Sequence, residues 1–65
     1  MDDHVQSMRR AAANLLLAQL AVLVEAEMKQ TRTADARALA ERGVAIGRPI
    51  LGADHTLVRQ LQRVL

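Results

Sequence analysis

The chain has 65 residues and a formal net charge of +2, and it contains neither cysteine nor any aromatic residue. A chain this short has room for a single small domain, residues 1–65, and the lack of cysteine excludes disulfides and cysteine-ligated zinc as sources of stability. The lack of aromatic rings weighs against base stacking on single-stranded nucleic acid and against aromatic anchors at an interface, so aliphatic side chains must build a helical core.

A long helix is expected over about residues 3–30. Asp2 or Asp3 is expected to cap its first turn, because a carboxylate there accepts backbone N–H groups and favours the positive end of the helix dipole. Its middle, residues 11–24, reads AAANLLLAQLAVLV and carries no charge. At about 100° per residue, its apolar side chains cover more than half of the helix circumference. They are Val5, Met8, Ala12, Leu15, Leu16, Leu17, Leu20, Leu23, Val24 and Met28.

An apolar arc this wide cannot be covered by one antiparallel helix from the same short chain. We therefore expect a second chain to complete the core, either an identical copy in a homodimer or a helical protein partner. The residues expected to contact that partner are Leu16, Leu17, Leu20, Leu23, Val24 and Met28.

The apolar run is not expected to enter a membrane. Residues 11–24 are interrupted by Asn14 and Gln19 and fall short of the roughly 20 apolar residues that a membrane span needs. The acidic start at Asp2 and Asp3 also differs from the basic start of a signal peptide. We expect no membrane partner and a cytoplasmic location.

Two shorter helices are expected to follow, joined by an irregular segment. Thr33 is expected to cap a helix over about residues 34–42, and Gly43 is expected to end it by adopting a left-handed conformation. Residues 43–53 are expected to form an irregular connector, because glycine and proline interrupt them. The apolar residues of this connector would plug one end of the bundle.

The last helix is expected over about residues 55–65, with Asp54 as its N-cap. Its apolar face comprises Leu57, Val58, Leu61, Val64 and Leu65. Its polar face comprises Arg59, Gln60, Gln62 and Arg63. The expected fold class is therefore all-α: a small helical hairpin or bundle of one long N-terminal helix and two shorter helices, completed by dimerisation or by a partner chain.

Residues 46–58 read IGRPILGADHTLV, which resembles a signature in the DNA-binding domain of the bacterial replication initiator DnaA, close to IGRxFGGRDHTTV. The matching residues are Ile46, Gly47, Arg48, Gly52, Asp54, His55, Thr56 and Val58. The resemblance implies a helix-turn-helix whose recognition helix opens with the Asp-His-Thr segment and enters the major groove. It implies base contacts from Asp54, His55 and Thr56, with Arg48 and Arg59 on the DNA backbone.

The chain also departs from the DnaA pattern. Pro49 lies inside the expected leading helix, Ala53 replaces an arginine that contacts phosphate, and Leu57 replaces a threonine. The residues upstream are too few to supply the preceding helix and basic loop at the family's spacing. A helix-turn-helix in this chain would therefore be a degenerate one.

The sequence predicts neither a catalytic site nor a cofactor or metal site. Asp54 and His55 are neighbours at a helix start, where the carboxylate does not orient the imidazole for proton transfer. The glycines lack the Lys-Ser/Thr sequence of a phosphate-binding loop. We expect a protein that is not an enzyme and that binds no cofactor.

Two functions of different classes remain open. The first is a non-catalytic protein-interaction module, acting as a regulator, inhibitor or chaperone through the apolar face of the N-terminal helix. The alternative is a dimeric DNA-binding regulator of transcription or replication, in which a degenerate helix-turn-helix occupies the C-terminal third. The DNA contacts of that alternative would come from Arg48, Asp54, His55, Thr56 and Arg59. A structural role as a small subunit of a larger complex is a further alternative.

Overall fold

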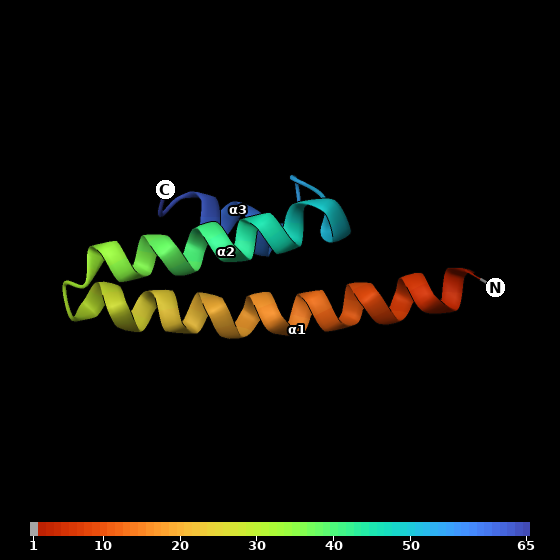
Figure 1. The fold of residues 1–65 in the computed structure, drawn as a ribbon, viewed down its shortest axis with the longest axis horizontal. Coiled ribbons are helices and arrows are strands. Elements are labelled where there is room, and N and C mark those ends of the chain that lie inside the picture. Colours follow the sequence, from red (N-terminus) through yellow and green to blue (C-terminus); the bar gives the residue numbers. More distant parts are fainter. Residues whose placement is uncertain (1) are drawn as a thin grey trace.

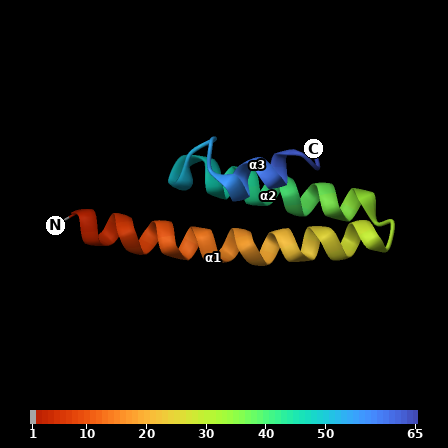
Figure 2. The ribbon, with the colours of Figure 1, turned by 180° about the vertical axis from the view of Figure 1, so that it is seen from behind.

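The computed structural model describes residues 2–65, with side chains from residue 3 onward, and over this range the chain is a small all-α bundle. Its helices are α1 (Asp2–Lys29), α2 (Thr33–Leu51) and α3 (Thr56–Gln62). α1 and α2 form an antiparallel hairpin, and α3 turns back along α2 and packs on both (Figure 1, Figure 2). The bundle is elongated, with extents of 45 × 17 × 15 Å. The all-α fold expected from the sequence is confirmed.

α1 contributes one stripe of residues to the core. Its buried residues recur every three or four positions, which is the periodicity of a single helix face. They are Ala13, Leu17, Leu20, Ala21 and Val24. Residues 3–12 are all exposed, because the N-terminal turns of α1 extend past the end of α2 (Figure 1). The capping role expected of Asp2 falls on a side chain outside the described part of the chain, and Asp3 is exposed.

α1 ends in a Schellman turn in which Thr31 adopts the left-handed conformation, with φ 57°. The N–H of Thr31 donates to the carbonyl of Met28 at 3.0 Å, and the N–H of Arg32 donates to the carbonyl of Glu27 at 2.8 Å. The turn closes so tightly that α2 begins directly after it. The expected cap at Thr33 is therefore wrong: Thr33 is already helical, and Arg32 occupies the cap position without a side-chain hydrogen bond.

α2 continues through the segment where the sequence predicts an irregular connector. The expectations that Gly43 ends the second helix and that residues 43–53 are irregular are wrong, since α2 runs to Leu51. Pro49 stands in the last turn of α2. Its missing N–H removes only the hydrogen bond to the carbonyl of Ala45, an exposed residue whose carbonyl can be hydrated instead. A proline this close to the end leaves the preceding turns of the helix intact.

Close packing against α1 and α3 explains the glycines inside α2. A Cβ atom at Gly47 would lie 2.5 Å from Leu17 Cδ2 and 2.9 Å from Val58 Cγ2. A Cβ atom at Gly43 would lie 2.5 Å from Leu61 Cδ1. The two glycines are therefore the places where α2 meets both other helices, and the packing they allow offsets their low helix propensity.

α3 has 7 residues and starts from a histidine cap. His55 has the extended backbone of an N-cap residue, and its Nδ1 accepts the N–H of Leu57 at 3.1 Å. The expected cap at Asp54 is wrong, because Asp54 lies one residue too early and is exposed. α3 also ends at Gln62, before the expected end at residue 65.

The core is built entirely from small and aliphatic residues where side chains are described. α2 and α3 contribute the buried residues Ala36, Ala40, Gly43, Val44, Gly47, Leu51, Val58 and Leu61. No polar or charged side chain is buried in the described part of the chain. Because the buried residues of α1 form a single stripe, α2 and α3 cover only one side of α1, and the opposite side is left open.

Candidate protein-interaction surface

A row of exposed residues runs along α1 on the side opposite the core. Successive members are alternately three and four positions apart, which is the heptad spacing of a coiled-coil seam. This row, the outer stripe, consists of Val5, Met8, Ala12, Leu15, Gln19, Val22 and Ala26. At about 100° per residue, Leu15 and Gln19 each lie about 160° around the helix from the buried Leu17. The outer stripe and the core therefore use opposite sides of one helix.

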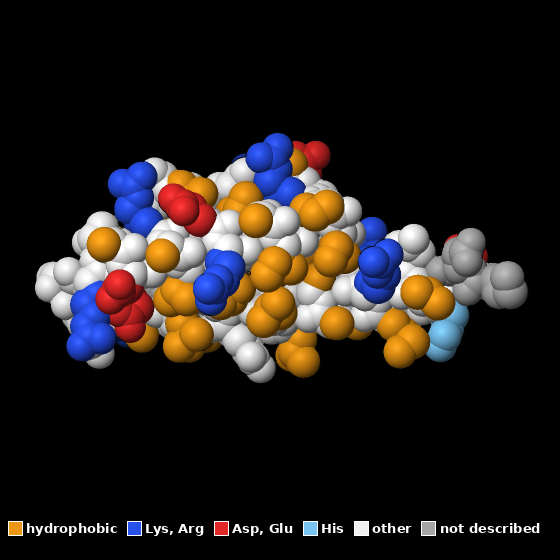
Figure 3. All heavy atoms as spheres, viewed as in Figure 1, with side chains coloured by type: hydrophobic (Ala, Val, Ile, Leu, Met, Phe, Trp, Pro, Cys, Tyr) orange, Lys and Arg blue, Asp and Glu red, His pale blue; other side chains and the backbone are white. Residues whose placement is uncertain are grey.

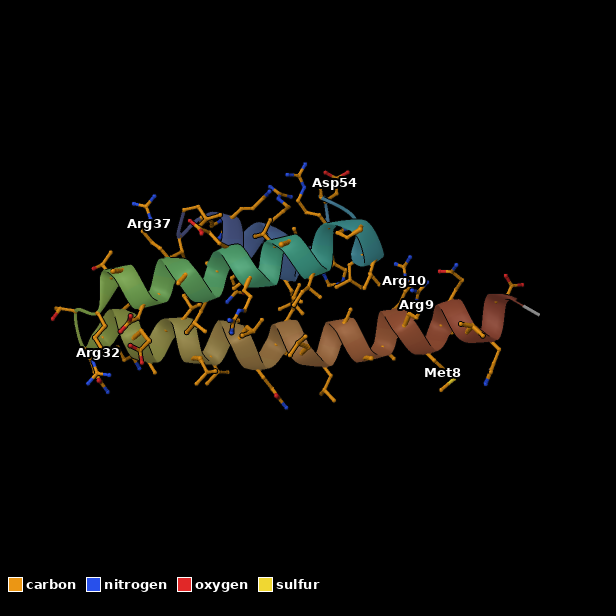
Figure 4. The ribbon with its side chains drawn as sticks, viewed as in Figure 1. Met8, Arg9, Arg10, Arg32, Arg37 and Asp54 are labelled. Carbon is orange, nitrogen blue, oxygen red and sulfur yellow. The ribbon has the colours of Figure 1, made fainter. Side chains whose placement is uncertain are left out.

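The large side chains of the outer stripe face solvent. Leu15, Val22 and Met8 are 65%, 64% and 60% exposed. Leu16 and Leu23, which flank the outer stripe along one edge, are 40% and 49% exposed. Figure 3 shows hydrophobic side chains along the length of α1, in the lower half of the view, and in Figure 4 Met8 points away from α2. Single exposed aliphatic residues are ordinary, but a row that follows a whole helix is typical of an interface.

The structure divides the interface residues predicted from the sequence. Leu17, Leu20 and Val24 are only 0%, 8% and 4% exposed. The expectation that they meet a partner is wrong, because α2 and α3 already cover them in the chain's own core. The predicted interface residues that remain exposed are Leu16, Leu23 and Met28.

The interface predicted from the sequence also omitted the whole outer stripe. The omitted residues with large exposed side chains are Val5, Met8, Leu15 and Val22. Their alternating spacing is a signal that the sequence does contain. On a helical projection, however, Leu16 and Leu23 join the outer stripe to the buried residues, so that two separate rows look like one broad arc.

The charged residues of α1 lie outside the outer stripe. Arg9 and Arg10 are exposed near the N-terminal end of α1, on the side opposite to Met8 in Figure 4. Glu25 and Glu27 lie near its C-terminal end, where Glu27 lines a pocket with α2 residues and Glu25 lines pockets with α3 residues. Glu27 Oε2 is also 3.8 Å from Arg32 Nη1, and the exposure of that arginine makes the ion pair a weak one.

The residues implied in DNA contact surround the turn between α2 and α3. Arg48 is exposed in the last turn of α2, and Thr56 and Arg59 are exposed on α3. Asp54 is exposed and points away from α1 in Figure 4. His55 is half-buried, and the capping hydrogen bond occupies its Nδ1. Only one of these side chains, that of His55, therefore has a structural role within the chain.

Metal binding and membrane insertion are two other roles that polar clusters and apolar helices can serve. Within residues 3–65, no three His, Cys, Asp or Glu side chains form a group that could hold a metal ion. Among the described helices, α1 over Asp3–Lys29 is long and apolar enough to cross a membrane by length and composition, criteria that the core helix of a soluble protein and a signal sequence also meet. α1 meets them because it is apolar on two sides, of which one lies in the core.

No family model, curated protein or solved structure matches this chain, so its surfaces are what indicate its function. Of the two candidate surfaces, the outer stripe has more residues and is continuous along one helix. The candidate DNA-binding surface, around the turn between α2 and α3, consists of a few separate polar side chains. The outer stripe is therefore the stronger candidate.

Proposed function

We propose that the protein is a non-catalytic interaction module that binds an α-helix of another polypeptide chain through the outer stripe of α1. The observation that carries this proposal is a complete heptad row of exposed residues on the side of α1 that faces away from the core. Such a row is the surface that a second helix covers in a coiled coil.

The energetics of the exposed row support a binding role. Fully burying an aliphatic side chain contributes about 1.5–3 kcal/mol, so covering side chains that are roughly half exposed contributes on the order of 1 kcal/mol each. Because α1 is already fixed by its packing on α2 between Ala13 and Val24, a partner does not have to order this part of the helix. Less of the binding free energy is then lost to conformational entropy.

The N-terminal turns of α1 give separate support. Residues 3–12 form helix although all of them are exposed. Helical turns without tertiary cover are only marginally stable in water. A helix bound along the outer stripe would cover Val5 and Met8 and stabilise these turns.

Photo-crosslinking inside cells tests this function. Leu15 is replaced by a photoreactive amino acid, and in a matched control the same replacement is made at Ala45, which is exposed on α2. We expect a crosslinked protein from position 15 and none from position 45. The mass of the adduct then shows whether the partner is a second copy or a different chain. Equal crosslinking from both positions, or none from position 15, would contradict the proposal.

DNA binding is the second candidate function. It is favoured by the order of α2, turn and α3 over the segment that resembles the DnaA signature, with Arg48, Thr56 and Arg59 exposed. α3 is short, and its Val58 and Leu61 are turned into the core, so few side chains remain to read bases.

Fluorescence anisotropy of a labelled random-sequence duplex separates this second function from the first. A DNA-binding protein would bind more weakly as salt rises, and Arg59→Ala would weaken all duplex sequences alike. We expect no binding at high micromolar protein. Salt-sensitive binding that Arg59→Ala weakens would favour the DNA function, and weaker DNA binding by Leu15→Glu would then show that the DNA-binding form is a dimer.

A further inference from the structure

We propose that the chain covering the outer stripe is a second copy of this protein in antiparallel orientation, so that two α1 helices form a two-stranded coiled coil. In this arrangement α2 and α3 of each copy lie on the outer sides of the pair. The inference rests on the proposed function, because it names the partner of the same surface.

The order of large and small residues in the outer stripe fits an antiparallel pair. Val5, Ala12, Gln19 and Ala26 occupy one heptad core position, and Met8, Leu15 and Val22 occupy the other. Antiparallel alignment sets Met8 level with Ala26 of the second copy, Ala12 level with Val22, and Leu15 level with Gln19. Met8, Leu15 and Val22 then each face an alanine or a flexible glutamine, as interdigitating layers require, and Val5 lies level with Lys29 of the second copy. A parallel pair would instead set alanine against alanine in two layers, and the small side chains would fill these layers poorly.

A lipid surface fits the outer stripe less well than a second copy does. Helices that lie on membranes are rich in lysine and arginine on their polar face. α1 carries three basic residues against four acidic ones: Arg9, Arg10 and Lys29 against Asp2, Asp3, Glu25 and Glu27. Gln19 stands in the middle of the outer stripe, where a single polar residue sets the register of a coiled coil.

Single cysteines test the alignment directly, because the chain contains no cysteine of its own. Met8→Cys and Ala26→Cys variants are mixed and oxidised, and the products are identified by mass spectrometry. We expect mainly the mixed disulfide, since antiparallel pairing brings residue 8 of one copy within bonding range of residue 26 of the other. An Ala45→Cys variant, with its cysteine on the exposed side of α2, is the control and should stay reduced. A disulfide that joins mainly Met8→Cys to itself would overturn the antiparallel alignment.

Sedimentation of the unmodified chain tests whether the protein associates with a second copy of itself. We expect a dimer, and we expect Leu15→Glu to weaken self-association by roughly a hundredfold, because it places a charge in the central layers. Leu15 is exposed, so the substitution leaves the chain's own core intact, and circular dichroism checks that the helices remain. Leu65→Glu changes another exposed leucine outside α1 and should leave the dimer unchanged.

Two outcomes separate the failure of this inference from the failure of the proposed function. A monomer at high micromolar concentration that crosslinks to a different protein from position 15 would overturn the second copy and leave the interaction function standing. A monomer that gives no such adduct and binds vesicles of phosphatidylcholine and phosphatidylglycerol would overturn both and assign the outer stripe to a lipid surface.

Discussion

Thr31 closes α1 in a backbone conformation that disfavours a β-branched residue. Its φ of 57° lies in the left-handed region, which costs a residue with a Cβ about 1–2 kcal/mol and costs glycine almost nothing. Glycine also loses more conformational freedom on folding, which offsets part of this gain. We predict that Thr31→Gly raises the free energy of unfolding by about 0.5–1 kcal/mol, measured by urea denaturation followed by circular dichroism at one fixed protein concentration.

Thr33 provides the matched control for this prediction. It stands in the first turn of α2 and does not have a positive φ, so the same threonine-to-glycine change there should lower the free energy of unfolding. Loss of stability in both variants would show that the left-handed conformation at Thr31 carries no strain that glycine relieves.

Substitution of Gly47 tests whether packing or helix propensity determines which residue is most stable at this position of α2. If propensity decided, Gly47→Ala would stabilise the protein by about 1 kcal/mol. We predict the opposite sign, a loss of about 1–2 kcal/mol, because the added Cβ would lie 2.5 Å from Leu17 Cδ2 and 2.9 Å from Val58 Cγ2, and both side chains are 0% exposed in the core. Thermal and urea unfolding measure the change.

Gly52 lies outside the packed region and serves as a comparison for Gly47. Its φ of 95° disfavours alanine, but no atom lies within 4 Å of an added Cβ. Gly52→Ala should therefore lose stability through backbone strain alone. In the Gly52→Ala variant, the packing around Leu17 should be unchanged. A Gly47→Ala variant that is more stable than the unmodified protein would contradict the close contact of α1, α2 and α3.

At the scale of the element, α1 could be predicted and the length of α2 could not. The uncharged run of residues 11–24 leaves few alternatives to a long helix. In α2, Gly43, Gly47 and Pro49 are helix breakers by local propensity, and the prediction of an irregular connector followed from that. The local cost is outweighed by tertiary contacts with α1 and α3, which the sequence of α2 alone does not contain.

The outer stripe illustrates a different limit of sequence reasoning. A helical projection shows that α1 is apolar over more than half of its circumference, but it does not show which half the other helices cover. That division depends on where α2 and α3 dock, and the docking is set by Ala36, Ala40, Gly43 and Gly47, whose small size permits close approach. The heptad spacing of the outer stripe was present in the sequence. The outer stripe can be told apart from the core only when it is known which residues on the opposite side of α1 are buried.

At the scale of the whole molecule, the small core makes stability and association hard to separate. A chain of this length buries only about 60% of the surface that its unfolded form exposes, so its folding free energy is small. The largest fully buried side chains are Leu17, Leu61 and Val58. A second copy bound along the outer stripe would bury apolar side chains of similar size. The stability of the folded state would then depend on protein concentration.

This dependence separates the two sides of α1. We predict that the melting temperature of the unmodified chain rises with concentration, because a partner that binds only the folded state stabilises it by mass action. Leu17→Ala should lower the melting temperature at every concentration, since deleting a buried leucine costs about 2–5 kcal/mol. Leu15→Glu should instead remove the concentration dependence and leave the melting temperature near that of the dilute unmodified chain. Thermal unfolding followed by circular dichroism, at concentrations about a hundredfold apart, measures all three. A melting temperature of the unmodified chain that does not change with concentration would show that folding and association are not coupled through the outer stripe.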